Sequence, residues 1–335
     1  MNRVVLPAAP RLPGYTWRPL SPQDAKALYR LERECAPLDG DSEPGSVAGY
    51  QRRLDDAGGS LATDTLGAVD AAGRLAACAW VTFDDRFGHE YRAMLDGLVH
   101  PDCRGRGLSG FLLEWMEEHA RQVHAAVGAG RPLALRIGFC DRGPDAIALF
   151  ERHGYRFFLT EHDMHRDLSR PIPQNPLPAG LAFVPWTPER AGLFYRTYLD
   201  AFSTRPLFSG MSEEAWCHAF TGLEGFRADL SRLMLKGAEP AGYALCAVIW
   251  GEGERTEREG WVTQMGVRPA WRHRGLAGCL LAEVIRQFVA ERVPYAWLDV
   301  NEDNPEARRV YERLGFVWAR SFTVYRKKVE PSEPS

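Results

Sequence analysis

Two short basic turns of nearly the same sequence constrain the fold of this chain more than any other feature. The turn at 104–110, Arg-Gly-Arg-Gly-Leu-Ser-Gly, recurs at 272–278 as Arg-His-Arg-Gly-Leu-Ala-Gly. A second pair of segments, at 150–155 and 311–316, recurs in the same order and at nearly the same spacing. Two motifs repeated in one order indicate an internal duplication. We therefore expect two similar halves.

Each turn lies between an apolar run and a long amphipathic stretch, which predicts a strand, a turn and a helix. The first backbone N–H groups of a helix have no partner within the helix and can bind an anion. Gly275 lets a ligand approach the backbone because glycine has no Cβ. Arg272 and Arg274 add positive charge. The turn therefore predicts a phosphate or pyrophosphate site.

The composition is that of an ordinary soluble globular protein. The 335 residues suggest about two domains, and 45% of them are hydrophobic and 25% charged. A net charge of -3 argues against nucleic-acid binding, and seven scattered cysteines without ligand spacing argue against a metal. There is no signal peptide and no apolar run near the ~18 residues that span a bilayer. We expect a cytoplasmic protein with neither a metal nor a membrane or nucleic-acid partner.

The order of predicted elements is the same in both halves: a strand, two helices, three strands, the turn and its helix, a strand, a helix and a final strand pair. A cluster of prolines between 171 and 180 predicts a linker. We therefore expect an N-terminal domain over 1–170, a linker over 171–180, a C-terminal domain over 181–328 and a tail over 329–335.

This order, with Arg-x-x-Gly-x-Ala after the fourth strand, resembles the GNAT superfamily of N-acetyltransferases. Arg272, Gly275 and Ala277 match the family's acetyl-CoA turn, and the first copy departs from it only at Ser109. The segment 304–316 is similar to the family's closing helix and strand. The tandem arrangement is also similar to two-domain members of the mycothiol synthase type, on architecture alone.

The resemblance implies an α/β (α+β) fold with two tandem GNAT-like domains. Each would be a mixed, mostly antiparallel sheet flanked by helices, with the fourth and fifth strands splayed apart. It also implies that acetyl-CoA, or another acyl-CoA, lies along the fourth strand and over the turn. The expected cofactor-binding residues are Met265, Val267, Arg272, His273, Arg274, Gly275, Leu276, Ala277 and Asn304 in the second half, and Val99, Arg104, Gly105, Arg106, Gly107, Leu108 and Ser109 in the first.

The resemblance also suggests how the reaction is catalysed. Tyr311 matches the family's tyrosine that protonates the leaving thiolate, a task of general acid catalysis. The base is open: Glu259 is one candidate, Asp299 and Glu302 are others, and a chain of waters is equally allowed. Asn304 is also expected to cap the closing helix.

The two halves differ at these catalytic positions, since the first has Phe150 where the second has Tyr311, and Gly143 where the second has Asn304. Phenylalanine has no proton to donate. We therefore expect the second domain to acetylate a primary amine of a small molecule and the first to be catalytically degenerate. The alternatives are a protein or peptide N-acetyltransferase and a non-catalytic acyl-CoA-binding module. The chain could be a monomer or a homodimer.

Overall fold

The computed structural model describes residues 12–39, 45–85, 89–127, 130–139, 144–205, 208, 210–223, 225–251 and 257–329. Its first half contains α1 (Ala25–Asp39), α2 (Val47–Ala57), α3 (Leu61–Asp64), α4 (Leu108–Val127) and α5 (Pro144–Arg152), and strands β1 (Tyr15–Arg18), β2 (Thr65–Asp70), β3 (Leu75–Asp84), β4 (Tyr91–Val99), β5 (Leu133–Phe139) and β6 (Arg156–Asp167).

The second half repeats this order. It contains α6 (Ala191–Phe202), α7 (Glu213–Thr221), α8 (Leu276–Ala290) and α9 (Pro305–Arg313), and strands β7 (Leu181–Pro185), β8 (Arg232–Lys236), β9 (Glu239–Trp250), β10 (Arg258–Val267), β11 (Tyr295–Asn301) and β12 (Val317–Val329). None of the helices in the described part of the chain is long and apolar enough to cross a bilayer.

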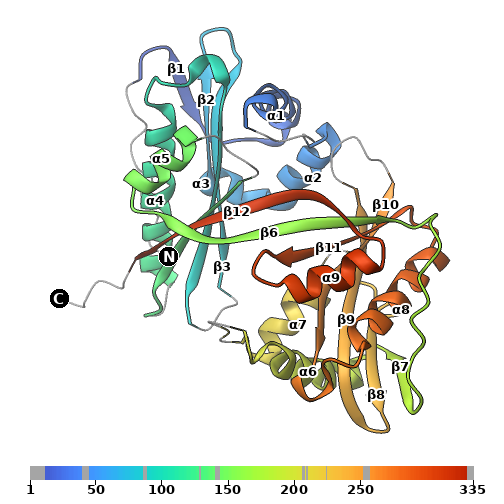
Figure 1. Cartoon of the computed structure of the whole chain (residues 1–335). Helices are drawn as coiled ribbons and strands as arrows, with labels where there is room; N and C mark the ends of the chain where they lie inside the picture. The colour runs from blue at the N-terminus through green and yellow to red at the C-terminus, as the bar shows by residue number, and fades with distance from the viewer. Residues whose placement is uncertain are drawn as a thin grey trace.

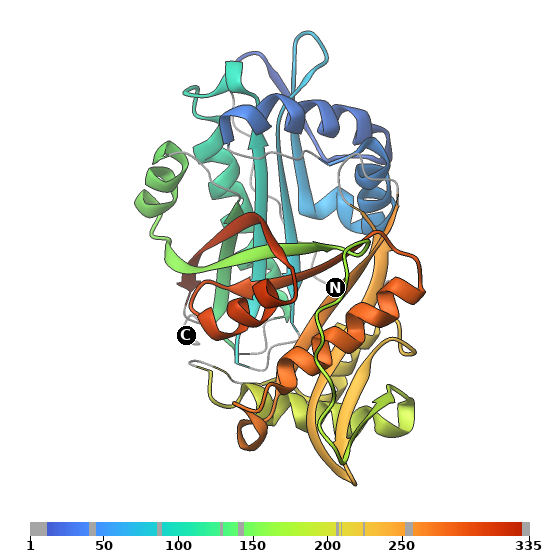
Figure 2. The same cartoon turned by 45° about the vertical axis from the view of Figure 1, so that its right-hand side comes forward.

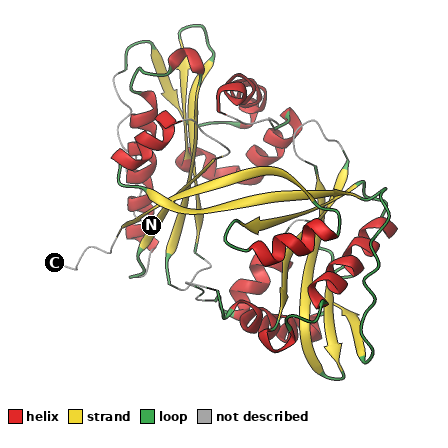
Figure 3. Ribbon diagram, in the orientation of Figure 1, coloured by secondary structure: helices red, strands yellow, loops and turns green. Residues whose placement is uncertain are grey.

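All twelve strands form one continuous, strongly twisted sheet (Figures 1 and 3). Their order is β1-β2-β3-β4-β5-β12-β6-β11-β10-β9-β8-β7. Among the strand pairs of the described residues, only β4–β5 and β10–β11 are parallel. The expected fold is therefore confirmed: each half is a mixed, mostly antiparallel sheet with helices on both faces.

The last strand of each half is exchanged between the halves. We expected a strand pair after each closing helix, but each half has one long strand there, β6 or β12. Strand β12 of the second half pairs with β5 of the first, and β6 of the first half pairs with β11 of the second. The two strands also pair with each other. In the described pairs, β6 and β12 each lie next to strands of the other half, so each completes the sheet of the other half.

Helices cover both faces of the sheet and bury four apolar clusters. In the first half, α4 and α5 pack on one face, and α1 and α2 pack on the other. In the second half, α8 and α9 pack on one face, and α6 and α7 on the other. This repetition follows from the matching order of amphipathic segments.

The segment 171–178 has no helix or strand and runs along α8 (Figure 2). The Cys279 thiol donates to the Pro176 carbonyl at 3.3 Å. Ile172 and Leu177 pack against the core beneath α8. The predicted linker therefore lies against the second half, and the domain boundaries themselves stay a prediction.

Candidate functional site

The parallel strand pair in each half separates part of the way along. In the first half, β4 and β5 are paired from Tyr91 to Met94 and no further. In the second, β10 and β11 share only the pairs Gly260–Ala296 and Trp261–Trp297. A β-bulge between Val262 and Gln264 bends β10 just beyond them. The second half therefore has the longer open gap between its splayed strands.

The two basic turns have matching backbone conformations. Gly105 and Gly107 have φ angles of 74° and 87°, and His273 and Gly275 have angles of 60° and 73°. A left-handed conformation is uncommon for a residue such as His273. Left-handed residues in a tight turn direct backbone N–H groups into one concavity, which suits an anion.

The helix that follows each turn offers further N–H groups. The first bonds within the helices run from Cys279 N to the Gly275 carbonyl at 3.2 Å and from Phe111 N to the Gly107 carbonyl at 3.1 Å. The N–H groups before these residues point out of the helix end. A Cβ at Gly107 or Gly275 would meet no atom beyond the adjacent residues within 4 Å. Both turns therefore fit the pyrophosphate of CoA.

The arginines of the turns were expected to add positive charge for a ligand, but they also form contacts within the protein. Arg272 donates from Nε to the Val267 carbonyl at 3.2 Å and from Nη2 to the Ala201 carbonyl at 2.6 Å. Arg104 donates to the Val99 carbonyl at 3.2 Å and binds Asp39 at 2.8 Å. These guanidinium groups fasten each turn to the preceding strand, and the backbone supplies the donors that face outward.

The other turn residues divide into anchors and surface groups. The side chains of Leu108 and Leu276 are buried in the cores, so only their N–H groups can reach a ligand. Arg274 donates to the Ala270 carbonyl at 3.0 Å and lies over the Trp271 ring. The remaining predicted turn residues are surface or partly buried: Arg106, Ser109, Ala277.

Strand β10 continues past the point where it leaves β11. Met265 and Val267 pair with Ala244 and Gly242 of β9, so one edge of β10 is bonded and the other faces the gap. Their side chains are half-buried against the core under α8. The other edge has backbone groups that pair with no described strand and suit an extended pantetheine arm, and the cofactor-binding role of these two residues stays a prediction.

Tyr311 lies on α9, close enough to Asp299 of β11 to be influenced by its charge. Asn304 caps this helix by accepting from Ala307 N at 3.2 Å, and Pro305 occupies its first position. The expected cap is thus confirmed. The Tyr311 ring is 8% exposed and packs near Phe316. Burial, and then the charge of Asp299, raise the pKa of its phenol well above the ordinary value. Tyr311 is therefore protonated at neutral pH and can donate.

Asp299 lies on β11 between Leu298 and Val300, whose side chains pack beneath α8 and α9. Because side chains alternate along a strand, Asp299 points to the opposite face, which α6 and α7 cover. Part of the Asp299 side chain is exposed to solvent, but protein atoms lie around its carboxyl group on most sides. Burial, and then Asp163, raise its pKa to about 6. A carboxyl with this pKa suits a general base at neutral pH.

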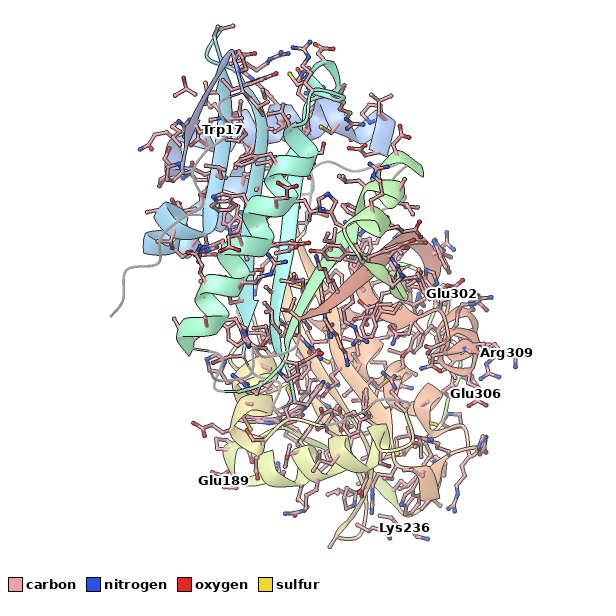
Figure 4. The ribbon with its side chains drawn as sticks, turned by 90° about the vertical axis from the view of Figure 1, so that its left-hand side faces the viewer. Trp17, Glu189, Lys236, Glu302, Glu306 and Arg309 are labelled. Carbon is pink, nitrogen blue, oxygen red and sulfur yellow. The ribbon has the colours of Figure 1, made fainter. Side chains whose placement is uncertain are left out.

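The other two candidate bases lie elsewhere. Glu259 is 2% exposed and lies on β10 before the strands separate. Glu302 is exposed at the edge of the molecule, near Glu306 and Arg309 (Figure 4). Of the candidates, Asp299 is the one whose charge influences Tyr311.

Sequence reasoning missed two carboxyl groups of this site, Glu161 and Asp163 on β6. Asp163 lies directly opposite Asp299 in the β6–β11 pair, and Glu161 lies opposite Asn301. Arg320 of β12 binds Asp163 at 2.7 Å. The strand exchange brings these first-half residues into the second-half site, and nothing in the local sequence signals that exchange.

In the first half the corresponding space is partly filled. Phe150 replaces Tyr311 and is buried. Gly138 stands where Asp299 would, and a Cβ there would lie 2.2 Å from the ring of Phe322 on β12. A cavity of about 280 Å³ remains between α1, α2 and the splayed strands, with Tyr50 and Phe322 in its wall.

Aromatic residues on the acceptor side of the second half act mainly in packing. Trp216 is fully buried, and its Nε1 donates to Gln264 Oε1 at 2.8 Å. Tyr243 donates to the same oxygen at 2.6 Å. Packing is therefore the role of Trp216, and Gln264 is held at the bulge.

Comparison with known proteins identifies the family. The sequence pattern of the Acetyltransferase (GNAT) family matches residues 25–155 and 193–316. A mycothiol acetyltransferase of Streptomyces scabiei is 29% identical over 235 residues, 69% of this chain and 70% of the relative. One from Streptomyces avermitilis is 27% identical over 318 residues, 92% of each chain.

Among solved structures, a GCN5-related N-acetyltransferase from Sphaerobacter thermophilus has 26% identity and a TM-score of 0.79, covering 98% of this chain and 99% of its own. The family match occurs twice, once in each half of the chain. The chain is an acyltransferase that belongs to the GNAT family of acetyltransferases, with two GNAT domains in tandem.

Proposed function

We propose that this protein transfers an acetyl group from acetyl-CoA to a primary amine of a small molecule, and that the second half performs the reaction. Tyr311 carries this proposal. Its phenol is protonated and is influenced by the charge of Asp299, and it belongs to the half with the longer open gap between its splayed strands. The first half has Phe150 and Gly138 at these positions. The relatives named for mycothiol support a small-molecule acceptor.

The two side chains divide the proton transfers between them. Acetyl-CoA supplies the acetyl thioester, held by the turn at 272–278 and the free edge of β10. Asp299 takes a proton from the incoming ammonium, and the freed nitrogen can then attack the thioester carbon. Tyr311 gives its proton to the departing sulfur, and the second proton lost by the nitrogen restores the phenol. The products are an amide, CoA and one proton.

A CoA-release assay with acetyl-CoA across a panel of small amines and N-terminal peptides tests the proposal. We expect turnover with small amines, and loss of turnover when Tyr311 is changed to Phe. Turnover confined to peptides would favour a protein acetyltransferase. Turnover with no amine of any kind would contradict the proposed function.

A further inference from the structure

Two carboxyl groups in the second-half site form no ion pair with a basic side chain in the described part of the chain. Glu161 and Asp299 make no ion pair there, whereas Asp163 between them is bound by Arg320. The exchanged strand β6 places Glu161 and Asp163 beside Asp299 on one face of the sheet. The acceptor side of the site is therefore lined by carboxyl groups from both halves.

The nearby arginines are engaged elsewhere. Arg136 binds Glu90 at 2.6 Å and lies over the Phe158 ring. Arg205 lies over the Phe202 ring, with its guanidinium carbon 4.2 Å from the ring centre. Both lower the pKa of Glu161, but burial, Asp299 and Asp163 outweigh them and raise it to about 7. The field at Glu161 therefore favours an added positive charge.

A second observation points independently to a ligand at this place. Tyr311 is more than nine-tenths buried, and no described residue forms a hydrogen bond with its phenol. Although the ring is buried, the phenol oxygen itself is accessible, so a bound molecule can reach it. The phenol lies close enough to Asp299 for the charge of that residue to influence its pKa. A bound molecule would give the phenol a partner and the carboxyl groups a counter-charge.

The register of the strands sets the spacing of the two carboxyl groups. Asp299 is opposite Asp163, and Glu161 is two residues further along β6, so Glu161 is the diagonal neighbour of Asp299. Diagonal neighbours are roughly 7–8 Å apart. Two cationic nitrogens joined by four or five methylene groups span a similar distance.

We propose that the acceptor is a dicationic amine, in which Glu161 binds the distant cationic nitrogen while the reacting amine lies between Asp299 and Tyr311. This inference rests on the proposed function and names its substrate class. It makes Glu161 a specificity-determining residue that the first half contributes to the second-half site. Charge-assisted hydrogen bonds of this kind are stronger than neutral ones.

The test compares 1,5-diaminopentane with 5-amino-1-pentanol, which lacks the second cation. For the wild-type protein we expect kcat/KM to be about tenfold higher or more for the diamine, the scale of one charge-assisted contact. Glu161→Gln should bring the two acceptors within about twofold, mainly through KM for the diamine. KM for acetyl-CoA should not change. The control is Glu312→Gln, an exposed carboxyl group paired with Arg308.

Calorimetric titration of the CoA-loaded protein with 1,5-diaminopentane runs in parallel. Binding by wild type that weakens about tenfold in Glu161→Gln would support the inference even if this diamine turns over slowly. The inference is overturned if the wild type prefers the amino alcohol, if it does not bind the diamine, or if Glu161→Gln keeps the preference. Turnover of other amines would still leave the proposed function standing, whereas no turnover with any amine would remove it.

Discussion

At the position of Tyr311 the two closing helices differ by a single hydroxyl group, because the first half has Phe150 there. Tyr311→Phe keeps the ring and its packing near Phe316 but removes the donated proton. We expect kcat for CoA release to fall about 10- to 1,000-fold, the scale of a lost general acid, with KM for acetyl-CoA unchanged. Tyr295→Phe, at the start of β11, is the control and should stay within about twofold. An unchanged rate in Tyr311→Phe would remove this residue from the mechanism.

Asp299 predicts how the rate depends on pH. Its pKa is raised to about 6, so it is a charged base above that pH and a neutral acid below it. We expect kcat/KM for the amine, which reports ionisations of the free enzyme, to fall about tenfold per pH unit below pH 6. Asp299→Asn should reduce this kcat/KM about 100-fold or more and abolish this limb of the profile. An unaltered limb in the variant would assign it to another group.

The ionisation of Glu161 predicts an effect on the stability of the fold. The charged form that would bind a cation is also the form that destabilises the folded protein. Its folded pKa of about 7 lies above the value of an unfolded glutamate, so its charged form destabilises the fold at high pH. Glu161→Gln should raise the free energy of unfolding by about 2–3 kcal/mol at pH 8. Because the wild-type group takes up its proton as pH falls through 7 toward 4.5, the difference should vanish there. Urea denaturation at pH 8 and pH 5 measures it, and equal differences at both would contradict this account.

At the scale of elements, local sequence predicted most of the structure. The strands before each closing helix follow the predicted order, because each run of strand residues is closed by turn residues. The cap at Asn304 and the turn before α8 were also predicted. The partners of the long strands β6 and β12 could not be predicted, because pairing between residues more than a hundred positions apart leaves no local pattern. That is why Glu161 was missed while Tyr311 was found.

In the whole molecule, neither half completes its sheet with its own strands alone. Strand β12 completes the first half beside β5, and β6 completes the second beside β11. We therefore expect urea unfolding to be one cooperative transition, with the same midpoint by far-ultraviolet circular dichroism and by tryptophan fluorescence. Tryptophans occur in both halves, for example Trp115 and Trp216. Two separated transitions would show that the halves fold independently.

The central claim is that only the second half performs the reaction, and a matched pair of glycine variants tests it most directly. Gly107 and Gly275 both have positive φ and open space where a side chain would lie. Asparagine tolerates that conformation, so Gly107→Asn and Gly275→Asn should fold while placing a side chain over the turn.

The measurement is the rate of CoA release by the two variants at saturating amine and limiting acetyl-CoA. We predict that Gly275→Asn loses at least about 90% of kcat/KM for acetyl-CoA, on the scale of a lost cofactor contact. Gly107→Asn should keep nearly all of it. Loss of activity in Gly107→Asn with activity retained in Gly275→Asn would place the reaction in the first half and contradict the account.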